Sequence, residues 1–127
     1  MWWMVVGLLV MGSAWPAWAE SKPPARSLRG TASWYTQASC RREGTSGVMA
    51  NGHRLDDRAF TAALRSYDFG KRYRVTNLAT GKSVVVTHTD YGPSPRLKDR
   101  VIDLSQAAFS AIEDLRHGVC NVTVEPL

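Results

Sequence analysis

Two aspartates in the second half of the chain are candidates for acid–base chemistry. Asp90 directly follows the β-branched run Ser83–Thr89, and Gly92-Pro93 turns the chain just after it. A carboxyl group at a strand end, partly removed from water, can hold its proton to higher pH and act as a general acid. The alternative is an aspartate that accepts hydrogen bonds from the backbone amides of its own turn. Spacing alone leaves both roles open.

Strand periodicity relates two further polar residues to Asp90. Alternate residues of an extended strand share a face, so His88 and Asp90 are predicted to lie on the same side as Val84 and Val86. Asp103 lies in a short apolar segment just before an expected helix. It can bond backbone amides at the helix start, or it can supply a second carboxylate to the same groove.

The elements that must position these side chains are mostly short strands. Strand-like composition covers residues 30–35, 72–78, 83–89, 101–104 and 119–125, with a short apolar piece at 60–64. Ser105 is a good N-cap for one helix, whose apolar face would carry Ala108, Phe109, Ile112 and Leu115 before a stop at Gly118. Residues 36–59 are polar and predict a long loop, either functional or disordered. Several strands with so little helix predict a mainly β protein with a closed or nearly closed barrel.

The first 19 residues contain no Lys, Arg, Asp or Glu and end in Ala17-Trp18-Ala19. An apolar stretch with this ending predicts a secretory signal peptide over residues 1–19. A flexible lead over residues 20–29 and one domain over residues 30–127 would follow. The alternative is an uncleaved membrane anchor. No cysteine follows the apolar run, so we expect no lipid anchor.

Charge narrows the class of partner. The chain carries a formal net charge of +5, which favours anionic envelope polymers or anionic lipid surfaces. Export argues against nucleic acid as a partner. Solubility alone is the simpler explanation of the charge.

The chain has two cysteines, Cys40 and Cys120. In an oxidising compartment an even number favours a disulfide between them. Such a bridge would close most of the chain into a loop. Chain-entropy models predict that a bridge across a loop of this length stabilises the folded state by about 4 kcal/mol. The alternative is two reduced thiols. Two cysteines do not make a zinc site, and we expect no metal or cofactor.

A series of short motifs in fixed order resembles the RlpA-like (rare lipoprotein A) domain, from about residue 30 to residue 125. The motifs are Gly30-Thr31-Ala32-Ser33-Trp34-Tyr35, Met49-Ala50-Asn51-Gly52, Thr61-Ala62-Ala63, the run from Phe69 to Leu78, Gly81-Lys82-Ser83-Val84-Val85-Val86, Asp90-Tyr91-Gly92-Pro93, and the run from Arg100 to Ala108. Any one of them alone would be weak, but their combination and spacing are specific.

The resemblance implies a six-stranded double-psi β-barrel related to the first domain of expansins, with one short helix near the C-terminus. It also implies a bacterial envelope or periplasmic enzyme, acting as a monomer on peptidoglycan glycan strands. Active members are lytic transglycosylases that prefer strands without stem peptides and leave 1,6-anhydro-muramyl ends. The catalytic carboxylate of the family falls on Asp90, and Asn51 and Asp103 fall among the expected substrate-binding positions. One carboxyl group can serve as acid and then as base in this reaction.

Three positions depart from the family pattern. His53 stands where the family usually has Glu, Leu64 where it has His, and Tyr91 where it has Arg. His53 can supply an imidazole as a second catalytic group, and His88 is another possible substitute. Tyr91 offers an aromatic face on which a sugar can stack.

Trp34 and Tyr35 could also stack on sugar, although aromatic residues of a small barrel more often belong to its core. Two other functions stay open beside the enzyme. One is a non-catalytic, expansin-like module that binds glycan or loosens the wall. The other is a barrel that binds another envelope protein.

Overall fold

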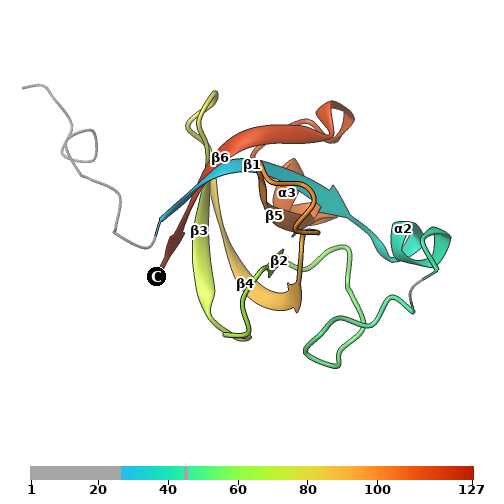
Figure 1. Cartoon of the computed structure of the whole chain (residues 1–127). Coiled ribbons are helices and arrows are strands. Elements are labelled where there is room, and N and C mark those ends of the chain that lie inside the picture. The colour runs from blue at the N-terminus through green and yellow to red at the C-terminus, as the bar shows by residue number, and fades with distance from the viewer. Residues whose placement is uncertain (1–26, 45) are drawn as a thin grey trace, which may run out of the picture.

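The computed structural model describes residues 27–44 and 46–127, and its dominant feature is a closed β-barrel (Figure 1). The strands are β1 (Leu28–Tyr35), β2 (Thr61–Leu64), β3 (Arg72–Asn77), β4 (Ser83–Tyr91), β5 (Arg100–Ser105) and β6 (Val119–Pro126). Around the barrel they follow the order β1-β5-β2-β4-β3-β6, and β6 pairs again with β1. The predicted six-stranded barrel is confirmed.

Two of the six strand pairs are parallel, β1 with β5 and β2 with β4, and the others are antiparallel. The short strand β2 lies between β4 and β5 and pairs with both. Residues near the ends of β4 and β5 are therefore brought to either side of β2. This arrangement positions the two aspartates singled out in the sequence.

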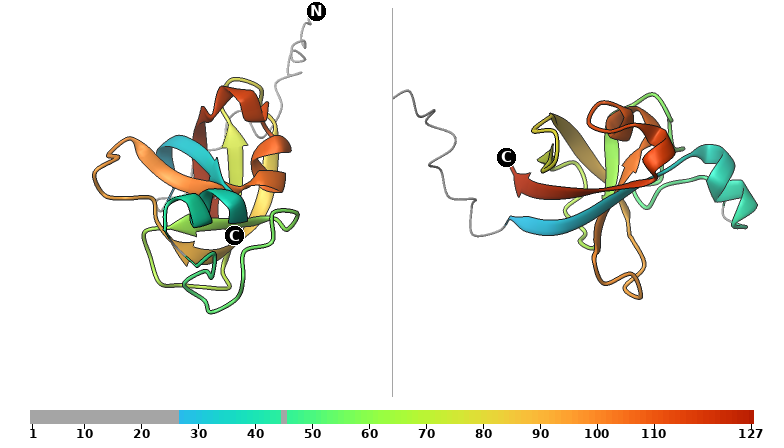
Figure 2. Two further views of the ribbon diagram at one scale, coloured as in Figure 1. Left: turned by 90° about the vertical axis from the view of Figure 1, so that its right-hand side faces the viewer. Right: turned by 90° about the horizontal axis from the view of Figure 1, so that it is seen from above.

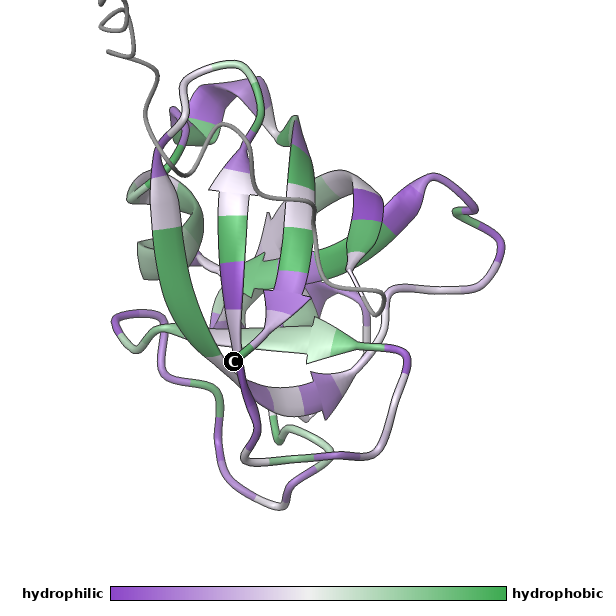
Figure 3. Cartoon of the chain, turned by 90° about the vertical axis from the view of Figure 1, so that its left-hand side faces the viewer, coloured by the Kyte–Doolittle hydropathy of each residue, from purple (hydrophilic) through white to green (hydrophobic). Residues whose placement is uncertain are grey.

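The barrel interior is filled by aliphatic side chains. On β6 the alternating residues Cys120, Val122 and Val124 are buried, as their shared parity predicts. Coloured by hydropathy, the strands carry apolar and polar bands in turn (Figure 3). Phe109 and Ile112, from the helical segment after β5, are fully buried and complete the core.

The helical segment after β5 is shorter than predicted. Ser105 caps α3 (Gln106–Ser110), and its hydroxyl accepts a hydrogen bond from the Ala108 amide at 3.3 Å. The single predicted helix is split, because Asp114 caps a new 3-10 helix, η2 (Leu115–His117). Gly118 ends it at a φ of 74°, a backbone conformation that favours glycine.

A second short α-helix, α2 (Gln37–Arg42), lies inside the segment predicted to be a loop. Its cap is reciprocal: the Thr36 hydroxyl accepts from the Ser39 amide, and the Ser39 hydroxyl accepts from the Thr36 amide. The usual capping box has Glu or Gln at the third helical position, so Ser39 gave no clear signal in the sequence. With the connection that follows it, α2 lies at one end of the barrel (Figure 1, Figure 2).

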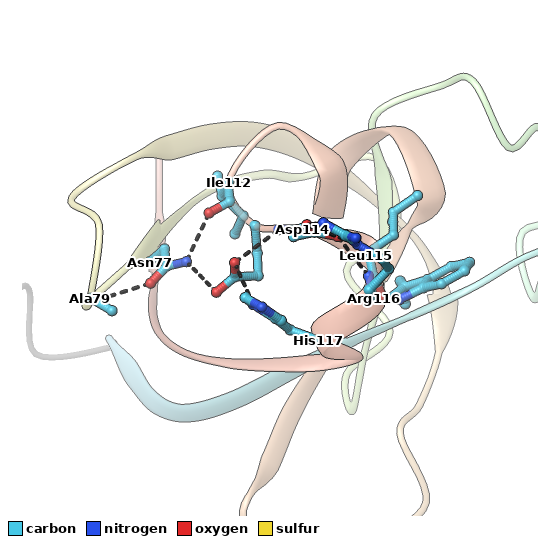
Figure 4. A network of polar contacts seen from close by, with 9 residues as sticks. Asn77, Ala79, Ile112, Asp114, Leu115, Arg116 and His117 are labelled. Atoms are coloured by element: carbon cyan, nitrogen blue, oxygen red, sulfur yellow. Dashed lines mark hydrogen bonds and ion pairs between the residues drawn. The ribbon is translucent and has the colours of Figure 1, made fainter.

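A buried asparagine ties the barrel to the segment between α3 and η2 (Figure 4). Asn77 is fully buried; its amide nitrogen donates to the Ile112 backbone oxygen at 2.8 Å and to Glu113 at 3.3 Å, and its oxygen accepts from the Ala79 amide at 2.9 Å. Nearby, Trp34 donates its indole N–H to the Leu115 backbone oxygen at 3.1 Å. These bonds fix the helical segment against the ends of β1 and β3.

The predicted signal peptide, residues 1–19, and most of the predicted lead lie outside the described residues. β1 begins at Leu28, two residues before the predicted start of the domain. In the part of the chain that the structure describes, no helix combines the length and the apolar character needed to cross a membrane.

Candidate active site

Asp90 lies at the end of β4, and three donors hold its carboxylate in place. Oδ1 accepts from the backbone amides of Tyr91 and Ala50, each at 2.9 Å, and Oδ2 accepts from the Tyr35 hydroxyl at 3.1 Å. The amide of Tyr91 is the local contact expected for a turn-capping aspartate. The bonds from Ala50 and Tyr35 come from distant segments, so the carboxylate is oriented by the tertiary structure as well as by its own turn.

A β-bulge separates the side chain of Asp90 from that of His88. β2 pairs Ala62 with His88 but Ala63 with Asp90, so Thr89 is the extra residue on β4. Since Ala62 and Ala63 are consecutive, their paired residues point to opposite faces. The prediction that His88 and Asp90 share a face is therefore wrong.

A groove of about 290 Å³ lies over this bulge, and the side chains of Asp90 and Asp103 both line it. Its lining residues are Tyr35, Cys40, Glu43, Gly47, Val48, Met49, Leu55, Ala63, Asp90, Tyr91 and Asp103. Ala63 pairs with Asp90 on one side and with Asp103 on the other. With strands about 4.8 Å apart, the two aspartate Cα atoms are separated by roughly 10 Å. We call this cavity the Asp90 groove.

Asp103 is the second carboxyl group of the groove, and it is partly buried. It accepts a hydrogen bond from the Ser33 hydroxyl, and a side-chain oxygen lies 3.8 Å from where a Cβ on Gly92 would be. Burial raises the pKa of Asp103, although the Ser33 bond and the charges of Arg100 and Arg65 oppose this shift. The helix N-cap is Ser105, so of the two predicted roles the structure supports a second carboxyl group in the groove.

Tyr35 is an aromatic partner of Asp90 that strand composition alone did not identify as polar. Burial, followed by the charge of Asp90, raises the pKa of its hydroxyl well above the usual range. Tyr35 therefore stays a neutral hydrogen-bond donor at physiological pH. Its neighbour Trp34 packs against the core beside Phe109, at 6.5 Å between ring centroids, as predicted for a core aromatic.

His88 lies beneath the groove and does not line it. Its side chain is fully buried, with Nδ1 at 2.7 Å from Asp68 and Nε2 at 2.9 Å from the backbone oxygen of Asp90. A backbone carbonyl only accepts hydrogen bonds, so Nε2 is a donor. A role for His88 in substrate binding or catalysis stays a prediction, and in this structure its contacts support the backbone of Asp90.

Asp68 completes the buried histidine's surroundings. Burial alone would raise the pKa of Asp68, but hydrogen bonds from Tyr73, Ser66 and His88 hold it well below its usual range. The two ring nitrogens of His88 thus lie between Asp68 on one side and the backbone oxygen of Asp90 on the other. A larger cavity of about 420 Å³ adjoins Asp68, Arg65 and Lys71, but its single carboxylate is already bonded in this way.

His53 and Asn51 belong to a turn at the rim of the Asp90 groove. The His53 side chain is exposed and is not among the residues that line the groove. The Asn51 side-chain oxygen accepts from the His53 amide at 3.0 Å, and the Asn51 amide donates to the Thr89 backbone oxygen at 3.1 Å. In this structure both residues shape the turn that delivers the Ala50 amide to Asp90, and neither side chain contacts Asp90.

The other two substituted positions have opposite environments. Leu64 is 2% exposed and belongs to the core cluster, so an apolar residue has taken the place of the family's His without leaving a polar gap. Tyr91 is exposed, lines the Asp90 groove and stacks on Tyr67, with 4.9 Å between ring centroids.

The predicted disulfide is absent from the structure. Both cysteines lie among the described residues, and no bridge joins them. Cys40 is on α2 and lines the Asp90 groove, whereas Cys120 is on β6 within the barrel core. Burial raises the pKa of the Cys120 thiol to about 11. An even number of cysteines carries no information about where the fold places them.

The chain matches a protein family model described as lytic transglycolase over residues 27–124. A protein of Nostoc sp. named "Probable endolytic peptidoglycan transglycosylase RlpA" is 44% identical over 102 residues, which cover 80% of this chain and 26% of that protein. The "Endolytic peptidoglycan transglycosylase RlpA" of Pseudomonas aeruginosa is 42% identical over 106 residues, which cover 80% of this chain and 28% of that protein. The chain thus spans little more than a quarter of the length of these two curated relatives.

Solved structures share the fold. The Streptomyces papain inhibitor aligns with a TM-score of 0.61 and 23% identity, covering 84% of this chain and 99% of the inhibitor. An expansin of Clavibacter michiganensis aligns with a TM-score of 0.56 and 23% identity, and the alignment covers 80% of this chain and 50% of the expansin. A variant of that expansin has been solved in complex with cellohexaose. The predicted double-psi β-barrel is confirmed by these neighbours.

Proposed function

Because the chain belongs to the lytic transglycolase family of RlpA, we propose that its Asp90 groove cleaves peptidoglycan glycan strands by transglycosylation. The observation that carries the proposal is the pair of carboxyl groups in one groove, Asp90 and Asp103, on either side of Ala63. Asp90 is held by three donors, and Asp103 is partly removed from water. In this reaction one carboxyl group can serve as acid and then as base, and a second one in different surroundings can bind the sugar.

The hydrogen bonds indicate which oxygen of Asp90 reacts. Oδ1 already accepts from two backbone amides, while Oδ2 receives only the Tyr35 hydroxyl. Oδ2 therefore has more room to bond the substrate, and we propose that it is the oxygen that transfers the proton in the reaction. It gives that proton to the glycosidic oxygen as the bond from this oxygen to the muramyl anomeric carbon breaks.

The same oxygen then acts as a base. Asp90 Oδ2 takes the proton of the muramyl C6 hydroxyl as O6 bonds to the anomeric carbon and closes a 1,6-anhydro ring. No water is consumed, and Asp90 ends the cycle protonated, as it began. Asp103, whose burial favours its protonated form, binds a hydroxyl of the sugar. Strands without stem peptides are the substrate that we propose.

The site of action follows from the substrate. We propose that residues 1–19 direct export, that the protein works in the bacterial periplasm or envelope, and that it acts as a monomer. The formal net charge of +5 supports attraction to anionic wall polymers.

A non-catalytic glycan-binding module is the second candidate function. Two observations favour it: the exposed His53 does not line the groove, and Leu64 replaces the family's His with a core residue.

One digestion separates these functions. The domain is incubated with denuded glycan strands, and the products are analysed by mass spectrometry. New 1,6-anhydro ends support transglycosylation, and new reducing ends would show hydrolysis instead. Retention on the glycan without any product would support the binding module and rule out the enzyme.

A further inference from the structure

Two exposed tyrosines stack on each other at the mouth of the Asp90 groove. Tyr67 is 77% exposed and Tyr91 is 43% exposed, and their rings lie 4.9 Å apart with only 20° between their planes. Single exposed apolar side chains are common on proteins, but a paired aromatic surface beside a groove marks a binding site more often. Tyr91 belongs both to this pair and to the groove lining.

The pair is braced from the interior. Tyr67 meets Phe69 edge-on at 6.1 Å, and Phe69 packs against the buried ring of His88 at 4.9 Å. The backbone of Tyr91 is fixed as well, since its amide donates to Asp90 Oδ1. The aromatic surface is therefore positioned by the same elements that position Asp90, and binding there costs little side-chain entropy.

We propose that Tyr67 and Tyr91 form a stacking platform for a pyranose ring of the glycan, next to the bond that Asp90 cleaves. The proposal rests on the function proposed above and names a sugar-binding subsite for it. The C–H face of a pyranose packs on an aromatic ring, and the tyrosine hydroxyls can bond the sugar's rim. Tyr67 covers one face of Tyr91 and holds that ring in place beside the groove.

The charge of the groove favours a neutral sugar over an anionic ligand. Besides Tyr91, the lining includes the carboxyl groups of Asp90, Asp103 and Glu43. A nucleic acid or a phosphate-rich lipid headgroup would meet these carboxylates at the same place where its flat or apolar part reached the tyrosines. An uncharged pyranose ring of the strand, unlike a muramyl ring with its free lactyl carboxylate, meets no such repulsion at the tyrosine pair.

The test measures binding and turnover separately, with denuded glycan oligosaccharides as the probe. Tyr67→Ala should weaken binding and raise KM by about tenfold while kcat stays close to wild type, because Tyr67 is not among the residues that line the groove beside Asp90. Tyr67→Phe should restore both values, since stacking needs the ring and not the hydroxyl. Phe60→Ala is the matched control, because Phe60 is also exposed, at 50%, but lies outside the groove lining.

Each outcome decides a separate point. Equal affinity of Tyr67→Ala and wild type would overturn the platform and leave the proposed enzyme standing. Wild-type binding without cleavage would overturn the enzyme, while the affinities of the Tyr67 variants would still decide the platform. A wild-type domain that does not bind the oligosaccharide would overturn both.

Discussion

The imidazole Nε2 of His88 lies 2.9 Å from the backbone oxygen of Asp90, two residues further along the same strand. The bulge at Thr89 turns the Asp90 side chain into the groove while His88 stays in the interior. On its other side the ring bonds Asp68. The carboxyl group proposed to do the chemistry is thus supported from beneath by a buried histidine and its partner.

Replacing the buried histidine should weaken both the fold and the site. His88→Leu removes two hydrogen bonds, one of them to a carboxylate, and leaves the Asp90 carbonyl without this donor. We expect a loss of roughly 2–3 kcal/mol in the free energy of unfolding, measured by urea denaturation. The double variant with Asp68→Asn should lose less than the sum of the two single changes. Strictly additive losses would contradict a coupled pair.

Replacing Asp103 should stabilise the protein at neutral pH. Its pKa is raised in the folded state, so the folded protein binds this proton more tightly than the unfolded chain does. The stability that this group contributes is therefore fully present below its pKa in the unfolded chain, about 4. It is lost as the pH rises through its pKa in the folded protein. Asp103→Asn removes that loss, and we expect a gain of roughly 1 kcal/mol at pH 7.

The two unfolding curves should converge at low pH, where the carboxyl group of Asp103 is neutral in both states. Urea denaturation at pH 3 and at pH 7 measures this difference. A variant less stable than wild type at pH 7 would show that ionised Asp103 stabilises the fold, against the direction of its pKa shift.

Removing one hydroxyl should affect catalysis far more than stability. Tyr35→Phe keeps the ring and deletes the donor to Asp90 Oδ2. A hydrogen bond to a charged group contributes about 1.5–3 kcal/mol, so we expect kcat for anhydro-end formation to fall roughly 10- to 100-fold. Glycan affinity should change little. An unchanged kcat would show that Tyr35 does not orient the reacting oxygen.

The asparagine network offers a test of stability alone. Asn77→Ala removes a fully buried amide and leaves the Ala79 amide and the Ile112 oxygen without this partner. We expect a loss of about 2–3 kcal/mol, seen as a lower midpoint in urea. The folded variant should keep its glycan-cleaving rate, because Asn77 is not among the residues that line the Asp90 groove. A rate that falls in fully folded protein would mean that this network reaches the groove.

Local patterns predicted much of the barrel. The β-branched run from Ser83, the alternating residues of β6 and the Ser105 cap all lie as expected, because each depends on neighbours in the sequence. The bulge at Thr89 was not predictable in this way, since it depends on the register between β4 and β2. Because of this one extra residue, the side chain of Asp90 lines the groove and that of His88 does not.

The candidate site was predicted in part. The sequence identified Asp90, Asp103 and Tyr91, which all line the Asp90 groove. It did not identify Tyr35 as a donor or Tyr67 as a stacking partner, because the direction of a side chain leaving a strand end or a turn depends on tertiary packing. The disulfide prediction had the same weakness, since it relied on the number of cysteines and not on their positions.

Asp90→Asn tests the central claim most directly. The variant keeps the size of the side chain and an oxygen that can accept the Ala50 and Tyr91 amides, but it cannot exchange a proton with the substrate. Wild type and variant are incubated with denuded glycan strands, and 1,6-anhydro ends are counted by mass spectrometry alongside a glycan-binding assay. The account predicts that the variant binds the strands and forms no anhydro ends. Anhydro ends formed at the wild-type rate would contradict it.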